Sequence, residues 1–359
     1  NLCIICDPFV EKSGMVNKLL RVLDEMGAQY RIFSDITPDP NTELVVQGLS
    51  RIVAHKPDAV LAMGGGSAID AAKAISYMYQ KTTGAEKPLC IAVPTTSGTG
   101  SEATSFAVIT DAETHIKYPI TDDKLLPNIA ILDPTLVRSV PPAVTADTGM
   151  DVLTHAIEAY VSVMASDYTD GLALHATEMV FTYLKASYNG DQLAREKMHN
   201  ASCIAGMAFT NAFLGLNHSM AHKLGGEFHI PHGRANAILL PYVIAYNAKK
   251  PTKFAAFPKY KEYVADKRYA KLAQRCGLCN VGTDTYEAVD CLIAAIQKLM
   301  MDTERPLTIK ACGVSEEEFL AKVDELSYKA FEDQCTTANP VYPLVSEIKE
   351  IYLQAYYGK

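Results

Sequence analysis

The stretch "AVLAMGGGSAIDAAKAISYMYQ", residues 59–80, indicates the fold class of this 359-residue chain. A short apolar run typical of a buried strand leads through three glycines into an alanine-rich helical pattern. Four similar apolar runs lie at residues 2–6, 30–34, 89–96 and 129–134, and helical patterns separate most of them. Strands that alternate with helices of about 10–15 residues form βαβ units. We therefore predict an α/β domain with a parallel sheet.

Two loops of this domain are rich in glycine and hydroxyl side chains. The three glycines at 64–66 precede a helical pattern, and "PTTSGTGSEAT" occupies residues 94–104. Glycine lets backbone N–H groups approach a phosphate closely, and a helix N-terminus adds partial positive charge. Both loops follow strands, and ligands bind at the carboxyl ends of strands in open α/β sheets. A single glycine turn would fit a plain tight turn equally well, but the two loops together predict a dinucleotide site.

Asp7 ends the first apolar run, "LCIIC". A carboxylate at this position can accept hydrogen bonds from ribose hydroxyls and would repel a 2′-phosphate, which favours NAD over NADP. The alternative is a carboxylate that caps the turn before Pro8.

The sequence pattern changes after about residue 145. The segment "SVPPAVTADTG", residues 139–149, contains two prolines followed by a Thr/Asp helix-start signal, and long helical patterns dominate beyond it. We predict a dinucleotide-binding α/β domain over residues 1–145 and an all-helical domain over residues 146–359, with a cleft between them.

Composition limits the class of partner. The net charge of −8 provides no basic field for nucleic acid or an anionic membrane, and no apolar run approaches the roughly 18–20 residues that span a bilayer. The nine cysteines have no framework spacing, and the C-x-x-C of Cys276 and Cys279 lacks the second pair of a zinc ribbon, so we expect free thiols and a cytoplasmic protein. The chain begins without Met or a signal peptide, and we expect a short N-terminal piece to be missing.

The segment "NHSMAHKLGGEFHIPHG", residues 217–233, holds four of the nine histidines. They are His218, His222, His229 and His232. Earlier in the chain, Asp151 and His155 stand four residues apart, a spacing that places two side chains on one helix face. Carboxylate and imidazole without thiolate suit Fe(II) or Zn(II) with an open coordination position. One such pair alone would fit a salt bridge or a core histidine. Two pairs predict a metal site in the helical domain, although spacing does not choose among the four histidines.

The motifs of both domains carry a family resemblance. "GGGSAIDAAK" (64–73), "PTTSGTGSE" (94–102), "KYPI" (117–120), "GMDVLTHAIEAYVS" (149–162) and the histidine-rich region to residue 247 resemble the iron-containing (group III) alcohol dehydrogenases over nearly the whole chain. The ending "FEDQCTTANPVYPLVSEIKEIYLQAYYG" is similar to the alcohol-dehydrogenase half of bifunctional aldehyde–alcohol dehydrogenases. "ICDPF" and "FSDITPDP" resemble the propanol dehydrogenases of propanediol-using bacteria. No aldehyde-dehydrogenase half is present in the sequence, so we expect a stand-alone enzyme.

The resemblance implies roles for individual residues. The metal ligands implied are Asp151, His155, His218 and His232. His222 is implied near the nicotinamide as a proton relay, and His229 matches no family function and is expected to be structural. The cofactor contacts implied are Asp7, Asp39, Gly65, Gly66, Ser67, Thr95, Thr96, Thr104, Lys117 and Leu136, with Asp39 standing where many members carry Asn. The substrate-pocket positions implied are Phe106, Phe209 and Cys335.

The function that the resemblance implies is an iron-dependent, NAD-linked alcohol dehydrogenase, with zinc as the alternative metal. It would interconvert short-chain primary alcohols and aldehydes such as 1-propanol and propanal, as a homodimer in the cytoplasm or inside a bacterial microcompartment. The alternatives are a zinc glycerol dehydrogenase, a lactaldehyde/1,2-propanediol oxidoreductase or a dehydroquinate-synthase-like enzyme on the same fold, and a non-catalytic NAD-binding or metal-storage protein. A dehydroquinate-synthase-like cleft would carry Lys and Arg, whereas "MAFTNAFLG" (207–215) is apolar.

Overall fold

A five-stranded parallel sheet organises the first part of the chain. The computed structural model describes residues 1–113, 117–252 and 262–359. It divides them into two units, Asn1–Ser139 and Val140–Lys359. The sheet of the first unit has the order β2-β1-β3-β4-β7 and every neighbouring pair is parallel. Its strands, in chain order, are β1 (Leu2–Cys6), β2 (Tyr30–Phe33), β3 (Ala59–Gly64), β4 (Leu89–Pro94) and β7 (Ile129–Ala130).

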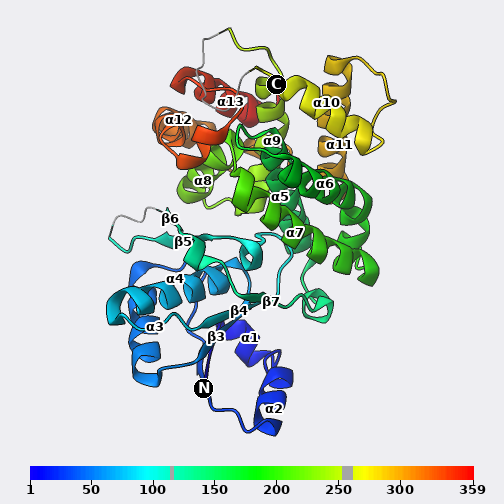
Figure 1. The fold of residues 1–359 in the computed structure, drawn as a ribbon. Helices are drawn as coiled ribbons and strands as arrows, with labels where there is room; N and C mark the ends of the chain where they lie inside the picture. The colour runs from blue at the N-terminus through cyan, green and yellow to red at the C-terminus, as the bar shows by residue number, and fades with distance from the viewer. Residues whose placement is uncertain (114–116, 253–261) are drawn as a thin grey trace. The chain divides into compact units, whose positions relative to one another are not determined.

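Helices cover both faces of this sheet (Figure 1). Alternate side chains of a strand point to opposite faces, so Cys3 and Ile5 of β1 pack in one apolar cluster and Ile4 and Cys6 in another. The first cluster includes side chains of the helices α3 (Thr42–His55) and α4 (Gly66–Thr83), and the second includes side chains of α1 (Pro8–Lys12) and of the segment that leads into α2 (Asn17–Glu25). Burial on both faces explains why β1 and β3 are continuous apolar runs rather than alternating ones.

A two-stranded antiparallel hairpin adds to the first unit. It pairs β5 (Phe106–Thr110) with β6 (Lys117–Thr121), and the sequence did not predict it. The lysine of the glycine-helix motif, Lys73, holds this hairpin to α4 from a fully buried position. Its Nζ donates to Ser101 Oγ at 2.9 Å, to Thr104 Oγ1 at 3.0 Å and to the carbonyl oxygen of Phe106 at 2.7 Å.

Asp70 completes the buried charge pair, with its Oδ1 3.8 Å from Lys73 Nζ and its Oδ2 accepting from the Val108 amide at 3.0 Å. Burial lowers the pKa of the Lys73 ammonium to about 8, and the Asp70 carboxylate opposes that shift. A buried charge persists only when it is paired and hydrogen-bonded. The Asp70–Lys73 pair therefore fixes the loop after β4 and the start of β5 against α4.

The second unit consists of helices joined by loops, with no β-strand among its described residues, and the predicted fold class is confirmed. Its helices are α5 (Pro142–Val161), α6 (Asp167–Tyr188), α7 (Gln192–Ala212), α8 (Leu216–Phe228), α9 (His232–Asn247), α10 (Ala265–Arg275), α11 (Thr285–Asp302), α12 (Glu316–Phe331) and α13 (Val345–Tyr357). α5 packs against α6, α7 and α9, and its side chains from Met150 to Val161 are all buried. Among the helices that the structure describes, none has the length and apolar character needed to cross a membrane.

Replacing Lys73 by Met should lower the free energy of unfolding by about 3–5 kcal/mol, because the largely buried Asp70 carboxylate would lose the Lys73 ammonium. That carboxylate would keep only neutral donors, the Ser101 hydroxyl and the Val108 amide. Adding Asp70→Asn should restore part of that loss, since no uncompensated charge then remains. The free energies would be measured by urea unfolding. Lys81→Met in the last turn of α4 is the matched control, because Lys81 is exposed, and we expect it to stay within about 0.5 kcal/mol of the wild type. A similar small effect for Lys73→Met would contradict the role given to this pair.

Candidate functional site

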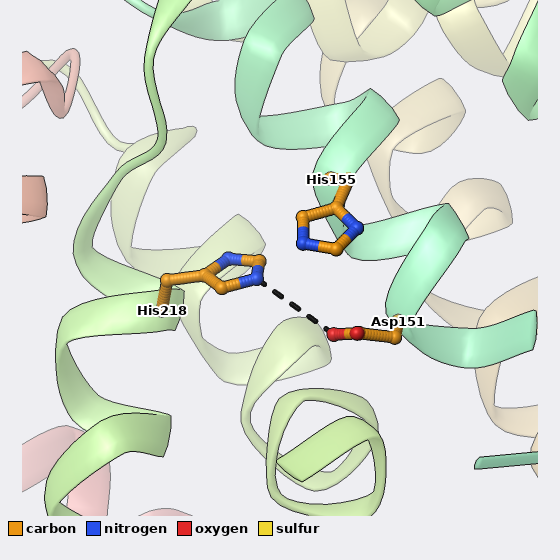
Figure 2. A group of neighbouring side chains, drawn as sticks. All are labelled: Asp151, His155 and His218. Carbon is orange, nitrogen blue, oxygen red and sulfur yellow. Dashed lines mark ion pairs between the residues drawn. The ribbon is translucent and has the colours of Figure 1, made fainter. Parts of the chain in front are cut away.

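Three helices of the second unit bring the predicted metal ligands together. Asp151 and His155 lie four residues apart on α5, His218 lies in the first turn of α8, and His232 is the first residue of α9. Donor atoms of Asp151, His155 and His218 all lie within 4.8 Å of one another, and all three residues are buried (Figure 2). The i, i+4 spacing on α5 directs both of its side chains toward the same point, which His218 reaches from the other side.

The fourth predicted ligand, His232, lies beside this group. Its Nε2 is 3.5 Å from Asp151 Oδ1, and His218 Nε2 is 3.7 Å from the same oxygen. The rings of His155 and His218 are stacked with centroids 4.6 Å apart, and those of His218 and His232 are 5.3 Å apart. All four predicted ligands are therefore gathered in one place, with Asp151 at its centre.

The donor set and its charge fit a divalent cation. Glu158 Oε2 lies 2.5 Å from His218 Nδ1, so two carboxylates flank one buried imidazole. Burial opposes protonation of His218, but Glu158 and Asp151 outweigh it and raise its pKa to about 9. Burial also opposes ionisation of Asp151, but its pKa is held below the usual range by the surrounding imidazoles. The negative charge of these two carboxylates would favour a bound cation, and the four predicted ligands include no thiolate that would select a structural zinc site.

Glu158 is a site residue that the sequence reasoning missed. A carboxylate that accepts from the second ring nitrogen of a histidine ligand fixes the ring orientation and the tautomer. Asp151, His155 and Glu158 form an i, i+4, i+7 row of polar side chains on a helix that is otherwise largely apolar. Extending the i, i+4 pair by one further turn would have found it.

His222, the predicted proton relay, belongs to a second group with Asp333 and Cys335. Its Nδ1 is 3.2 Å from Asp333 Oδ2, and its ring stacks on that of His232 at 5.4 Å. Lys223 Nζ lies 2.8 Å from the same carboxylate oxygen, so an ammonium already occupies the place where a second cation would bind. Burial opposes ionisation of Asp333, but His222 and Lys223 outweigh it and lower its pKa. Asp333 thus orients the His222 ring.

His229 lies outside both groups. It is the C-cap of α8 with a φ of 54°, a left-handed conformation that ends the helix. The expectation of a structural role agrees with this position.

The predicted cofactor residues of the first unit fall into two sets. The first set gathers at the carboxyl ends of β1, β3 and β4. Asp7 caps α1 by accepting from the amides of Phe9 and Val10 at 2.9 and 3.0 Å, and its Oδ2 would lie 3.2 Å from a Cβ at Gly64. Thr95 N donates to the Gly64 carbonyl at 2.9 Å. The members of this first set are Asp7, Gly65, Gly66, Ser67, Thr95, Thr96 and Thr104.

The glycines of this loop are needed for its close packing. A Cβ at Gly66 would meet Thr99 Cγ2 at 2.7 Å, and one at Gly65 would meet Thr96 at 3.3 Å. The two loops that the sequence singled out therefore lie against each other, with the N-terminus of α4 at one end. This arrangement resembles an anion site for a phosphate.

The second set consists of Asp39, Lys117 and Leu136, which come from other segments of the first unit. Lys117 on β6 forms an ion pair with Asp39, whose Oδ1 is 2.6 Å from Lys117 Nζ. Asp39 has a φ of 54°, and both Asp and Asn tolerate this left-handed conformation, which accounts for the departure from the family's Asn. Leu136 lies in a short 3₁₀ turn, Pro134–Val137, and packs against the apolar cluster that includes Ile4.

The predicted pocket residues lie in both units. Phe209 is buried, and its ring stacks on that of His155 at 4.5 Å. Cys335 is buried and its amide donates to Asp333 Oδ1 at 3.0 Å. Phe106 is the first residue of β5 in the first unit. Two of the three positions therefore contact the residues of the metal cluster or the His222 group.

Family models match both units. One for iron-containing alcohol dehydrogenases matches residues 1–134, and one for the C-terminal part of the Fe-containing alcohol dehydrogenase family matches residues 145–356. The chain is 47% identical to aldehyde-alcohol dehydrogenase 2 of Entamoeba histolytica, over 99% of its own length and 43% of the relative's. It therefore spans less than half the length of the bifunctional relatives that it matches.

Other relatives match over most of their own length. The 1-propanol dehydrogenase of Citrobacter freundii is 46% identical, with 98% of this chain and 92% of the relative covered. The solved iron-containing alcohol dehydrogenase of Thermococcus thioreducens aligns with a TM-score of 0.89 and 34% identity, covering 100% of this chain and 93% of that one.

The contact between α5 and α9 at Gly233 gives a stability prediction. A Cβ at Gly233 would lie 2.0 Å from the Asp147 carbonyl oxygen and 3.2 Å from Asp151 Cβ, so Gly233→Ala must push α9 away from α5. We expect it to lower the free energy of unfolding by about 1–3 kcal/mol, measured by urea unfolding. The matched control is Gly226→Ala in α8, where a Cβ meets nothing within 4 Å. That substitution should raise stability by up to about 1 kcal/mol, and equal effects of the two would show that helix propensity, not contact, governs Gly233.

Proposed function

Since this chain belongs to the iron-containing alcohol dehydrogenase family, we propose that it is an NAD(H)-linked dehydrogenase that interconverts short-chain primary alcohols and aldehydes. The observation that carries the proposal is the buried convergence of Asp151, His155 and His218 from two helices, with His232 beside them. A carboxylate and three imidazoles hold one divalent ion without satisfying every coordination position, which leaves room for a substrate oxygen.

We assign the metal to Asp151, His155, His218 and His232, with Fe(II) favoured by the family and Zn(II) accepted by the same donor set. When bound, the ion supplies positive charge that makes an alcohol hydroxyl more acidic or polarises an aldehyde carbonyl. The chain contributes the orientation of the ligands, because Glu158 fixes the ring of His218. Burial of Asp151 keeps water from weakening its attraction for the ion.

His222 is the proposed proton relay. Asp333 accepts a hydrogen bond from Nδ1–H of His222, which leaves Nε2 to release a proton toward the substrate oxygen in aldehyde reduction and to take it up in alcohol oxidation. Lys223 beside Asp333 keeps that carboxylate ionised, so the orientation of the His222 ring persists through both steps.

The first unit is proposed to hold NAD(H), which would supply the hydride in aldehyde reduction and accept it in alcohol oxidation. The adjacent loops at Gly65–Ser67 and Thr95–Thr104 would receive the pyrophosphate, and Asp7 the adenosine ribose. A solved relative, the sulfoacetaldehyde reductase of Bifidobacterium kashiwanohense, is a complex with NAD⁺ at 29% identity. Residues 1–145 would thus be the cofactor domain and residues 146–359 the metal domain.

The substrate is proposed to be a short aliphatic aldehyde such as propanal, in line with the 1-propanol dehydrogenase relative. None of the pocket positions that the resemblance implies, Phe106, Phe209 and Cys335, carries an amide that could bind a second hydroxyl. The propanol-dehydrogenase resemblance also leads us to propose a homodimer, in the cytoplasm or in a bacterial microcompartment, with no nucleic-acid or membrane partner.

The activity is tested by NADH consumption with protein stripped of metal and reloaded with Fe²⁺ or Zn²⁺. We expect propanal to be reduced with a kcat/KM about 5- to 150-fold above that of lactaldehyde, because an unpaired hydroxyl against apolar side chains costs about 1–3 kcal/mol. His218→Ala should lose bound metal and turnover together, whereas His229→Asn should keep both because Asn tolerates the same φ. Absence of aldehyde reduction in both metal forms would refute the dehydrogenase proposal, and full metal stoichiometry in His218→Ala would refute the ligand assignment.

The cofactor preference is tested with Asp7→Ser. Serine retains an N-cap acceptor for the amides of Phe9 and Val10, so α1 stays capped, but the negative charge is removed. We expect kcat/KM with NADPH to rise relative to NADH, while the melting temperature changes little. An unchanged ratio of kcat/KM for NADPH and NADH would mean that residues other than Asp7 set the preference for NADH.

A further inference from the structure

A buried asparagine lies among the proposed metal ligands. Asn236, one turn after His232 on α9, is fully buried. Its Nδ2 lies 2.7 Å from Asp151 Oδ1, 3.1 Å from His218 Nε2 and 3.2 Å from His232 Nε2. The uncharged amide group of Asn236 therefore contacts atoms that would bind the metal, and these atoms belong to side chains of three different helices, α5, α8 and α9.

Hydrogen-bond chemistry fixes the orientation of this amide. Asn217 Nδ2 lies 3.1 Å from the main-chain carbonyl of Asn236, and a carbonyl oxygen can only accept. The terminal atom of Asn217 on that side must therefore be its nitrogen. The same nitrogen is 2.9 Å from the near terminal atom of Asn236, which must then be Oδ1. The far atom of Asn236 is its nitrogen, and it faces a carboxylate, Asp151, that can only accept.

Asn217 is itself held in place, since its backbone N–H donates to Glu158 Oε1 at 2.7 Å. Glu158 Oε2 in turn contacts His218 Nδ1 at 2.5 Å. A continuous buried chain thus runs from the carboxylate that orients His218, through Asn217 and Asn236, to the carboxylate of Asp151. Each link has its donor and acceptor assigned.

We propose that Asn236 is a positioning residue that holds the carboxylate of Asp151 in the orientation needed to bind the metal ion. The inference rests on the metal site of the proposed function. The amide donates to Asp151 Oδ1 without adding charge, so the carboxylate is fixed and its full negative charge remains for the cation. A lysine or arginine in this place would fix the carboxylate too, but its charge would repel the ion. Partners that orient a metal ligand typically contribute 10- to 100-fold to affinity.

The test compares two buried asparagines of α9. Asn236→Leu keeps the side-chain shape and removes the donor, and we expect the dissociation constant for Zn²⁺, measured by competition with a chromophoric chelator, to rise about 10- to 100-fold. Asn247→Leu is the matched control, because Asn247 Nδ2 donates to Asn339 and Tyr269 instead of to a proposed ligand. It should lower the melting temperature of the metal-free protein and leave Zn²⁺ affinity unchanged. The visible spectrum of the Co²⁺-loaded protein should change in Asn236→Leu only.

Asn217→Ala provides a second variant if Asn236→Leu does not fold, since it leaves Asn236 in place but frees its amide to turn. It should also weaken Zn²⁺ binding. Wild-type affinity and an unchanged Co²⁺ spectrum in folded Asn236→Leu, or wild-type affinity in Asn217→Ala, would overturn the positioning role while leaving the metal site intact. Failure of the wild-type protein to bind Zn²⁺, Co²⁺ or Fe²⁺ would instead overturn the metal site, and this inference with it.

Discussion

Two carboxylates buried inside the helical unit, Asp151 and Glu158, impose the constraint on which the rest of that unit depends. A carboxylate removed from water must find donors or positive charge, or it destabilises the fold by several kcal/mol. Glu158 is compensated by α8, through the amide of Asn217 and the ring of His218. Asp151 is compensated mainly by imidazoles and by Asn236. The groups that form the site therefore also link α5, α8 and α9. The same contacts stabilise the packing of these helices and position the proposed metal ligands.

The first unit also contains a buried charged side chain, but its charge is positive. There the buried group is the Lys73 ammonium, and its three oxygen acceptors come from the loop after β4 and from β5. One of these acceptors is the hydroxyl of Thr104, a proposed cofactor contact, and another is the carbonyl of Phe106, a proposed pocket residue. In both units, then, a buried charge on a helix fixes the position of the residues on which the proposed chemistry relies.

Local patterns predicted the parts of the structure that depend on neighbours in sequence. The apolar runs predicted the parallel strands, and the four-residue spacing of Asp151 and His155 predicted that they share a helix face. The hairpin of β5 and β6 was missed because Phe106–Thr110 is short and its stability comes from α4 and Lys73, far away in sequence. Asp333 and Asn236 were missed for the same reason: each has its role only through contacts with histidines on another turn or another helix.

The same pairing of imidazole with carboxylate serves two different purposes in this unit, and the surroundings decide which. His218 is only 1% exposed and stands between two buried carboxylates, so its ring is fixed and its second nitrogen faces Asp151. The side chain of His222 is 25% exposed, and its partner Asp333 is shared with the ammonium of Lys223. Partial exposure gives the ring of His222 access to a proton source, and the contact with Asp333 keeps that ring oriented. A fixed, buried imidazole suits a metal ligand, and an oriented, accessible one suits proton exchange, so burial rather than residue type separates the two roles.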